Sequence, residues 1–193
     1  LISSSLAAYA FARMKFKGSN LIYYVLLSTM MVPPQITMIP MFLIMKTLGL
    51  LDTHWAIILP AFFGFQGAFG VFLLRQFFAP IPKDLEDAAE IDGCGKFKIF
   101  WHIFLPQSKP VIATLIVFNF MYFWNDLLNP VIYLSSMQKM TLTVGFASIH
   151  GLNFLRFDLM MAGAFLSILP ILILFIFAQK FFIQSVVQSG IKE

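Results

Sequence analysis

The stretch "KDLEDAAEIDGCGKFKIFWHIFLPQSKP", residues 83–110, lies between two long apolar runs and holds five of the nine carboxylates in the chain. The remaining sequence is strongly apolar. Of 193 residues, 60% are hydrophobic and 11% are charged, and the mean hydropathy is +0.86. Soluble domains carry roughly 25% charged residues. The composition therefore predicts a membrane protein in which charge is concentrated in one segment.

Four nearly uncharged runs reach the length of about 20 residues that a helix needs to cross a bilayer. They cover residues 21–45, 56–74, 110–134 and 159–178. The opening "LISSSLAAYAFA", residues 1–12, is apolar but too short to span, so we expect it to be the end of a truncated span. The first full run contains Pro33, Pro34 and Pro40, which cannot continue a straight helix. The expected fold class is an all-α, polytopic membrane helix bundle.

The lysines and arginines fall in alternate loops, which predicts an orientation because basic residues in short loops stay on the cytoplasmic side. Ten lie on one side and three on the other. The larger group is Arg13, Lys15, Lys17, Arg75, Lys83, Lys96, Lys98, Lys109, Lys180 and Lys192, and the smaller group is Lys46, Lys139 and Arg156. We therefore expect residues 80–108 and the C-terminus to be cytoplasmic, and residues 135–158 to form an outer loop.

A short helix is predicted at the start of the charged stretch. Asp84 is a good N-cap residue, and Glu86 and Asp87 would lie in the positive first turn. Gly93 and Gly95 supply the flexible exit that a helix end commonly uses. The helix would have about two turns, and isolated helices shorter than roughly 12 residues are marginal in water. Contacts with other parts of the protein must therefore hold it.

One face of this helix would carry Leu85, Ala88 and Ala89, whose small side chains allow close entry into a groove. An amphipathic segment follows and stops at Pro106. Its aromatic residues recur at spacings of three and four: Phe97, Phe100, Trp101 and Phe104. Two interpretations stay open. The stretch is either an interfacial loop at the lipid headgroups or a docking element whose acids meet basic residues of a soluble partner.

The spacing of the stretch resembles the cytoplasmic EAA loop of permease subunits in ATP-binding-cassette importers. That pattern is Glu-Ala-Ala, three residues, Gly, nine residues, Ile, one residue, Leu-Pro. This chain has Asp87, Ala88, Ala89, Gly93, Ile103, Leu105 and Pro106 at the same intervals, with Asp in place of the usual Glu. The segments "IPKDLEDAAEIDG" and "FLPQSKP" look like the carbohydrate-uptake branch, similar to the second permease of maltose-type transporters. The segments "AAYAFARMKFKG", "LLRQFF", "WND" and "MAGAF" extend the resemblance over most of the chain.

The resemblance implies a type I ABC importer permease fold, N-terminally truncated, because members carry an additional N-terminal helix and a complete further span. The loop would be a coupling helix that sits in a cleft of a separate cytoplasmic ATPase and transmits its closure to the spans. The implied ATPase-coupling residues are Glu86, Asp87, Ala88, Ala89, Gly93, Ile103, Leu105 and Pro106, with Glu86 as a second acid beside Asp87.

The same resemblance implies the partners and the location. We expect ATP-binding-cassette ATPase subunits, a second permease subunit and an extracytoplasmic solute-binding protein, which the outer loop could reach. A heterodimer of permeases is expected, and a homodimer stays open. The location would be the cytoplasmic (inner) membrane of a prokaryote, with the lipid bilayer as surroundings. Nucleic acid is not expected, because the net charge of +4 is small and the loop distribution accounts for it.

Catalytic motifs are absent from the sequence. The segment "GCGKF" lacks both the spacing of a phosphate-binding loop and the hydroxyl residue after its lysine. His54, His102 and His150 are scattered, and Cys94 has no partner at metal-ligand spacing. We therefore expect a transport subunit rather than an enzyme, with no metal and no cofactor in this chain. ATP would be bound by the partner ATPase.

Asp126 is the sole acid within a predicted span. An ionised carboxylate at the bilayer centre costs about 2.5–3.5 kcal/mol, so it should face protein or water. Together with Trp124 and Asn125 it forms a candidate substrate pathway, since aromatic faces and polar groups commonly bind sugars. A structural network joining spans is the alternative, as is a position near the outer surface.

The sequence thus predicts a permease subunit of an ATP-driven importer that translocates a sugar or oligosaccharide. Two alternatives stay open. One is a membrane scaffold that recruits a cytoplasmic partner without transporting anything, and the other is an ion-coupled carrier that uses Asp126.

Overall fold

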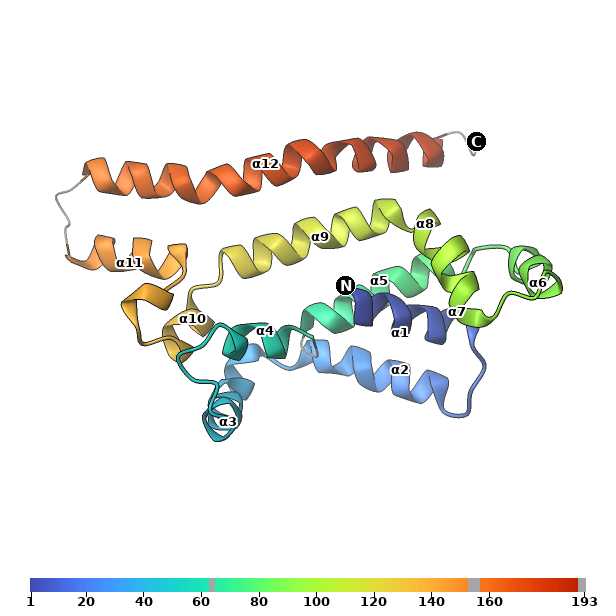
Figure 1. The fold of residues 1–193 in the computed structure, drawn as a ribbon, viewed down its shortest axis with the longest axis horizontal. Helices are drawn as coiled ribbons and strands as arrows, with labels where there is room; N and C mark the ends of the chain where they lie inside the picture. The colour runs from blue at the N-terminus through green and yellow to red at the C-terminus, as the bar shows by residue number, and fades with distance from the viewer. Residues whose placement is uncertain (63–64, 153–156, 191–193) are drawn as a thin grey trace. The chain divides into compact units, whose positions relative to one another are not determined.

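A computed structural model of the chain describes residues 1–62, 65–152 and 157–190 (Figure 1). Every regular element in this part of the chain is helical, which confirms the predicted all-α class. In chain order the elements are α1 (Ile2–Arg13), α2 (Ser19–Ser28), η1 (Thr29–Met31), α3 (Pro34–Thr47), α4 (Trp55–Ala61), α5 (Phe65–Phe78), α6 (Asp84–Ile91), α7 (Lys96–Ile99), the π-helical η2 (Phe100–Phe104), α8 (Leu105–Gln107), α9 (Lys109–Trp124), α10 (Leu128–Tyr133), η3 (Met137–Lys139), α11 (Leu142–Leu152) and α12 (Phe157–Gly190).

The chain divides into two compact units. The first comprises residues 1–32, 62–116 and the segment from 180 onward, and the second comprises residues 33–61 and 117–179. The charged stretch 83–110 lies entirely in the first unit, and the candidate pathway residues 124–126 lie in the second.

Helices α1, α2 and α5 pack side by side in the first unit (Figure 1). Helices α1 and α5 come close together at Gly70, where an added Cβ would lie 3.0 Å from both Cβ and Oγ of Ser4. Small residues allow helix backbones to come this close. The buried core of the unit extends from these helices into the charged stretch and contains Ala8, Tyr9, Tyr23, Val71, Leu74, Phe78, Ile81, Ile99, Phe100, Phe104 and Leu115.

The end of α1 is bonded to α5 by an arginine. Arg75 Nε donates to the carbonyl of Phe11 over 3.4 Å, and its guanidinium lies 4.1 Å from the ring centre of Tyr23. The last carbonyls of a helix have no partner within the helix, so a donor from a neighbouring helix stabilises its end. Helices α1, α2 and α5 are therefore fixed together where α1 ends.

The second unit has a smaller core of Met45, Ala56 and Tyr133, contributed by α3, α4 and α10. Helix α9 is joined to α12 by the indole Nε1 of Trp124, which donates to the carbonyl of Ser167 over 2.9 Å. This bond lies one turn before Pro170, whose ring interrupts the backbone bonding of α12.

Within the described residues, two helical stretches are long and apolar enough to cross a membrane, Trp55–Phe78 and Phe157–Phe181. Up to four spans result if two bent pairs each count as one, namely Ser19–Met31 with Pro34–Thr47 and Lys96–Gln107 with Lys109–Trp124. The first pair is broken at Val32 and Pro33, where proline was expected to interrupt the helix. The second pair bends by 76°.

Two segments differ from the expected boundaries. The helix expected through 110–134 ends at Trp124, and α10 begins at Leu128. Asp126 accepts the backbone N–H of Asn129, and side chains that bond nearby backbone groups compete with the helix. The expected outer loop 135–158 contains helix α11, whose residues Leu142, Phe146 and Ile149 follow a helical spacing that its polar neighbours obscure.

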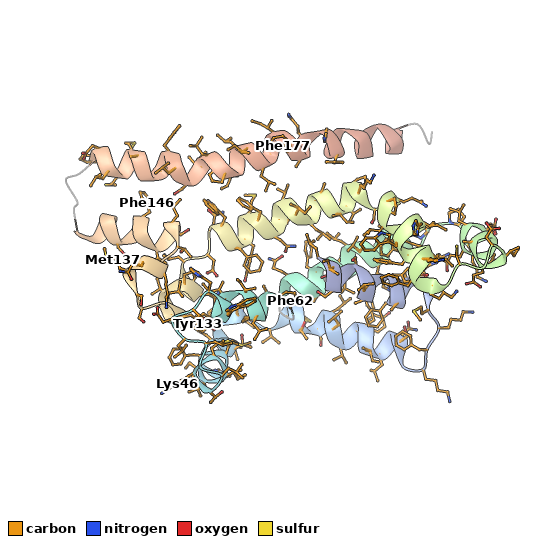
Figure 2. All side chains as sticks on the ribbon, in the orientation of Figure 1. Lys46, Phe62, Tyr133, Met137, Phe146 and Phe177 are labelled. Atoms are coloured by element: carbon orange, nitrogen blue, oxygen red, sulfur yellow. The ribbon has the colours of Figure 1, made fainter. Side chains whose placement is uncertain are left out.

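Apolar side chains of α12 are exposed between Phe157 and Phe177. Phe177, 67% exposed, is one of them (Figure 2). None of the most apolar part of the Phe157–Phe181 stretch is buried within the chain. Such a surface requires lipid or another apolar protein surface around it.

The contact at Gly70 gives a first prediction. Gly70→Ala places a methyl group against Ser4, and over-packing of this kind costs about 1–3 kcal/mol. The matched control is Gly145→Ala in α11, where an added Cβ meets nothing within 4 Å. Both changes gain similar helix propensity, so the thermal unfolding midpoint of Gly70→Ala in detergent should lie below that of Gly145→Ala. Equal midpoints would contradict the close packing of α1 on α5.

Candidate functional site

Helix α6, Asp84–Ile91, is the two-turn helix expected at the start of the charged stretch. The predicted N-cap is wrong. Asp84 is the first helical residue, the cap position is Lys83, and no side chain caps the helix. Three acids, Asp84, Glu86 and Asp87, instead fill the first turn, where the positive end of the helix dipole favours them. Charge in the first turn thus replaces a capping hydrogen bond.

The end of α6 explains Gly93. The N–H of Cys94 donates to the carbonyl of Ala89 over 2.9 Å, and the N–H of Gly93 donates to the carbonyl of Glu90 over 3.0 Å. These two bonds form a Schellman motif, which needs a left-handed residue after the helix. Gly93 has φ +77°, whereas Gly95 is extended with φ −73°. Only the first of the two glycines is required by backbone geometry.

The predicted small-residue face of α6 is divided between two sides of the helix. Leu85 and Ala88 are exposed, but Ala89 is half-buried and packs on the core of the first unit. Ile91, three residues beyond Ala88, is 87% exposed. We call Leu85, Ala88 and Ile91 the outward face. Asp87 lies beside it with its side chain 53% exposed, in a 3.8 Å surface ion pair with Lys83.

Glu86 was expected to act as a second acid beside Asp87, but it lies on another side of α6. Its side chain is buried, and it accepts a hydrogen bond from Nε of Arg13 at the end of α1. Arg13 Nη1 also donates to the carbonyl of Ile81 over 3.0 Å and to that of Ala79 over 3.3 Å. The carboxylate of Glu86 thus faces Arg13 inside the chain instead of lying exposed beside Asp87, and its predicted ATPase-coupling role stays a prediction.

Arg13 was not predicted as a site residue. The sequence does contain a signal for it, because Arg13 is the first charge after an apolar stretch and lies within "AAYAFARMKFKG". Sequence analysis assigned it to orientation alone. Its pairing with an acid more than seventy residues away cannot be read from spacing, since both partners also fit solvated positions.

The aromatic segment ends one residue beyond the predicted stop at Pro106. The chain continues helically from Lys96 through the π-helical turn of η2 to Gln107. Proline is tolerated at the first positions of α8, where its missing N–H needs no partner. Phe100 and Phe104 are buried, whereas Phe97 and Trp101 are exposed and stack with ring centres 6.3 Å apart.

The second half of the motif lies close to the same core. Ile103 and Leu105 are half-buried and pack against the core of the first unit, while Pro106 is exposed. These two positions thus support the loop from within. The exposed part of the motif is limited to Asp87, Ala88 and Pro106, together with the backbone of Gly93.

The structure does not assemble Trp124, Asn125 and Asp126 into one site. Trp124 bonds to α12, and its carbonyl accepts Oγ1 of Thr143 over 2.8 Å. Asn125 bonds back to its own helix at Met121. Both oxygens of Asp126 accept from Asn129, over 3.2 and 2.7 Å. Trp124 therefore joins α9 to α12, Asn125 and Asp126 bond within their own segment, and the predicted pathway role stays untested.

Asp52 holds two segments of the second unit together. Its carboxylate accepts the hydroxyl of Ser136 and the backbone N–H groups of Ser136 and Ser135, the latter two over 2.9 and 3.0 Å. These bonds lower the pKa of Asp52 below its ordinary value. Lys139 Nζ donates to the carbonyl and to the carboxylate of Asp52 over 2.7 and 3.2 Å, and His54 contacts the Lys139 carbonyl. This cluster fixes the start of segment 135–158.

Within residues 1–62, 65–152 and 157–190, no group of three His, Cys, Asp or Glu side chains is placed to hold a metal ion. The side chain of His150, named in the sequence analysis, lies outside the described part. The site that stands out is therefore α6 with its outward face, rather than a catalytic or metal centre.

Residues 1–188 match the family model of the binding-protein-dependent transport system inner membrane component. The chain belongs to this family. The predicted type I importer permease fold and permease role are thereby confirmed, and a membrane location follows. Members work with ABC partners, an ATPase and a solute-binding protein, which agrees with a transport subunit rather than an enzyme.

Curated relatives carry the similarity further. The chain is 38% identical over 195 residues to the arabinooligosaccharides transport system permease protein AraQ of Halalkalibacterium halodurans, covering 100% of this chain and 68% of the relative. It is 37% identical to the lactose transport system permease protein LacG of Rhizobium radiobacter, covering 98% and 68%. It is 34% identical to the melibiose/raffinose/stachyose import permease protein MelC of Bacillus subtilis, covering 100% and 70%. Another relative, the probable permease YurM of Bacillus subtilis, is covered over 63% of its length.

The Schellman motif predicts how α6 responds to substitution at its end. Gly93→Ala forces a left-handed conformation on a residue with a Cβ, at a cost of about 1–2 kcal/mol. Gly93→Asn should cost less, because Asn tolerates that conformation. Gly95→Ala is the matched control, since its backbone is extended and nothing lies within 4 Å of the added Cβ.

Hydrogen exchange of the α6 amides measures this effect. Exchange should be fastest in Gly93→Ala, intermediate in Gly93→Asn and unchanged in Gly95→Ala. Identical exchange in Gly93→Ala and Gly95→Ala would show that the motif does not fix the helix end.

Proposed function

We propose that this chain is the membrane-spanning permease subunit of an ATP-driven importer for a sugar or oligosaccharide, and that α6 is its coupling helix. The curated relatives named above support the sugar class, since their names specify arabinooligosaccharides, lactose and melibiose, raffinose or stachyose. ATP is bound by a separate ATPase, and this chain carries no cofactor of its own.

The observation that carries the proposal is the outward face of α6. Leu85, Ala88 and Ile91 are exposed apolar side chains at spacings of three residues. Exposed acids flank them at Asp84 and Asp87. A short amphipathic helix of this kind suits an apolar groove with a basic rim, because the groove buries the apolar stripe while the rim meets the acids.

Coupling follows from the opposite face of the same helix. Ala89, and Cys94 in the turn beyond it, pack against the core that also holds residues of α1, α5 and η2. A helix fixed on one face and docked on the other transmits displacement as a rigid lever. Closure of the ATPases would therefore move the first unit through α6 rather than deform the loop.

The basic residues support the cytoplasmic assignment of α6 and the C-terminal segment. Among the described residues, every lysine and arginine assigned to the cytoplasmic side belongs to the first unit, and Lys46 and Lys139, assigned to the outer side, belong to the second. The location is proposed to be the inner membrane of a prokaryote. The basic residues assigned to the two sides of the membrane thus belong to different units of the fold.

The other partners use other surfaces. The apolar surface of α12 suits lipid or a second permease subunit, with a heterodimer as the proposed assembly. The outer segment fixed by Asp52 presents Met137, 86% exposed, to the extracytoplasmic solute-binding protein (Figure 2). Docking there needs a fixed loop, and the bonds around Asp52 supply it.

The test uses the complete subunit with its sister permease and ATPase in membranes. Ile91→Asp puts a charge into the docked stripe, so capture of the ATPase should fall about tenfold or more, the effect of about 1.4 kcal/mol at an interface centre. ATP-dependent sugar uptake in vesicles should fall with it. Met137→Asp, an equally exposed change on the outer side, should leave ATPase capture unaltered.

Unchanged capture and unchanged uptake in Ile91→Asp would remove the coupling role and favour an interfacial loop. Loss of capture without any sugar uptake by the unaltered complex would favour the scaffold interpretation. Uptake that collapses with the ion gradient while ATP is intact would indicate an ion-coupled carrier.

A further inference from the structure

We propose that Arg13 and Glu86 are positioning residues that connect the coupling helix to the end of α1, so that movement of α6 reaches the membrane helices. This proposal rests on the coupling function of α6 given above. In this proposal a buried ion pair transmits the movement of the docked α6 to the membrane-spanning helices.

The pair joins three segments at one point. Arg13 lies in the last turn of α1, Glu86 lies in α6, and the same guanidinium donates to the carbonyls of Ala79 and Ile81 in the connection between α5 and α6. The side chains of Arg13 and Glu86 are 10% and 4% exposed. Because the charges are shielded from water, their attraction is stronger than that of a surface pair.

Aromatic rings hold the guanidinium of Arg13 in position. Arg13 lies 5.3 Å from the ring centre of Phe104 in η2. The Phe104 ring in turn packs 4.9 Å from Tyr9 in α1 and 5.4 Å from Phe78 in α5. The arginine head therefore sits between α6 and the ends of three other helices, and a displacement of Glu86 acts on all of them.

Other ion pairs of α6 do not make this connection. Lys83 with Asp87 and Lys96 with Glu90 are exposed and remain within the loop itself. Surface pairs of this kind contribute little and are screened by salt. In the part of the chain that the structure describes, Arg13–Glu86 is thus the ion pair that links α6 to α1.

The guanidinium also has a spare donor. Arg13 Nη2 is buried and has no hydrogen-bond partner among the described residues. Because Nε and Nη1 are already engaged, Nη2 is free to take over when α6 shifts relative to α1. The pair can then persist through a small movement instead of breaking, which is what a link that transmits motion requires.

The experiment must separate positioning from simple stability. Glu86→Gln or Arg13→Met alone leaves one buried charge unpaired, which destabilises a fold strongly. The double apolar variant Arg13→Met with Glu86→Leu removes both charges, and such replacements of buried pairs are commonly neutral or stabilising. We therefore expect the double variant to fold while the polar link is lost. Glu90→Gln, at an exposed acid of the same helix, is the matched control.

All variants are made in the complete subunit and assembled with the sister permease, the ATPase and the binding protein in vesicles. The readouts are the amount of folded subunit, ATPase capture, and ATP hydrolysed per sugar taken up. For the double variant we expect capture within about twofold of the unaltered complex and about tenfold more ATP hydrolysed per sugar, a coupling loss in the usual range for contacting residues. Glu90→Gln should match the unaltered complex in all three readouts.

A double variant that folds and transports with the unaltered ratio of ATP to sugar would overturn the proposal and leave the pair as a stabilising contact. Failure of the proposed function would look different. In that case the unaltered complex itself would show no ATP-dependent sugar uptake, or its uptake would not respond to Ile91→Asp.

Discussion

The burial of one charged pair organises the part of the first unit that contains α6. Helix α6 has eight residues and is too short to be stable on its own in water. The Arg13–Glu86 pair, the packing of Ala89 and the Schellman motif at Gly93 hold it instead. A buried carboxylate without a partner is strongly unfavourable, so Glu86 must stay paired with Arg13. This pairing fixes which face of α6 turns toward α1. The outward face is exposed as a consequence.

The residues of the EAA-like motif therefore have two different roles. Asp87 and Ala88 face solvent, whereas Gly93 shapes the backbone and Ile103 and Leu105 fill the core beneath. A short recurring pattern is often interpreted as a single contact surface. Here most of its positions build the support, and the proposed contact surface includes exposed Ile91, which the pattern does not contain.

Sequence reasoning was strongest where a physical rule acts locally. Apolar length predicted helices, proline predicted the break near Val32, and glycine predicted the end of α6. It failed where distant or competing contacts decide. The partner of Glu86 lies in another helix, and Asp126 bonds to Asn129 where α9 ends. Helix α11 was missed because its threonine, serine and glycine residues mask an apolar spacing.

The central claim is that the outward face of α6 docks on the ATPase while its other face belongs to the permease. Photo-cross-linking in the assembled transporter tests it most directly, with the reactive residue at Ile91 in one sample and at Ala89 in the other. The account predicts cross-links from position 91 to the ATPase, and from position 89 to the permease itself. Cross-links from position 91 to lipid, or to the ATPase equally from both positions, would contradict it.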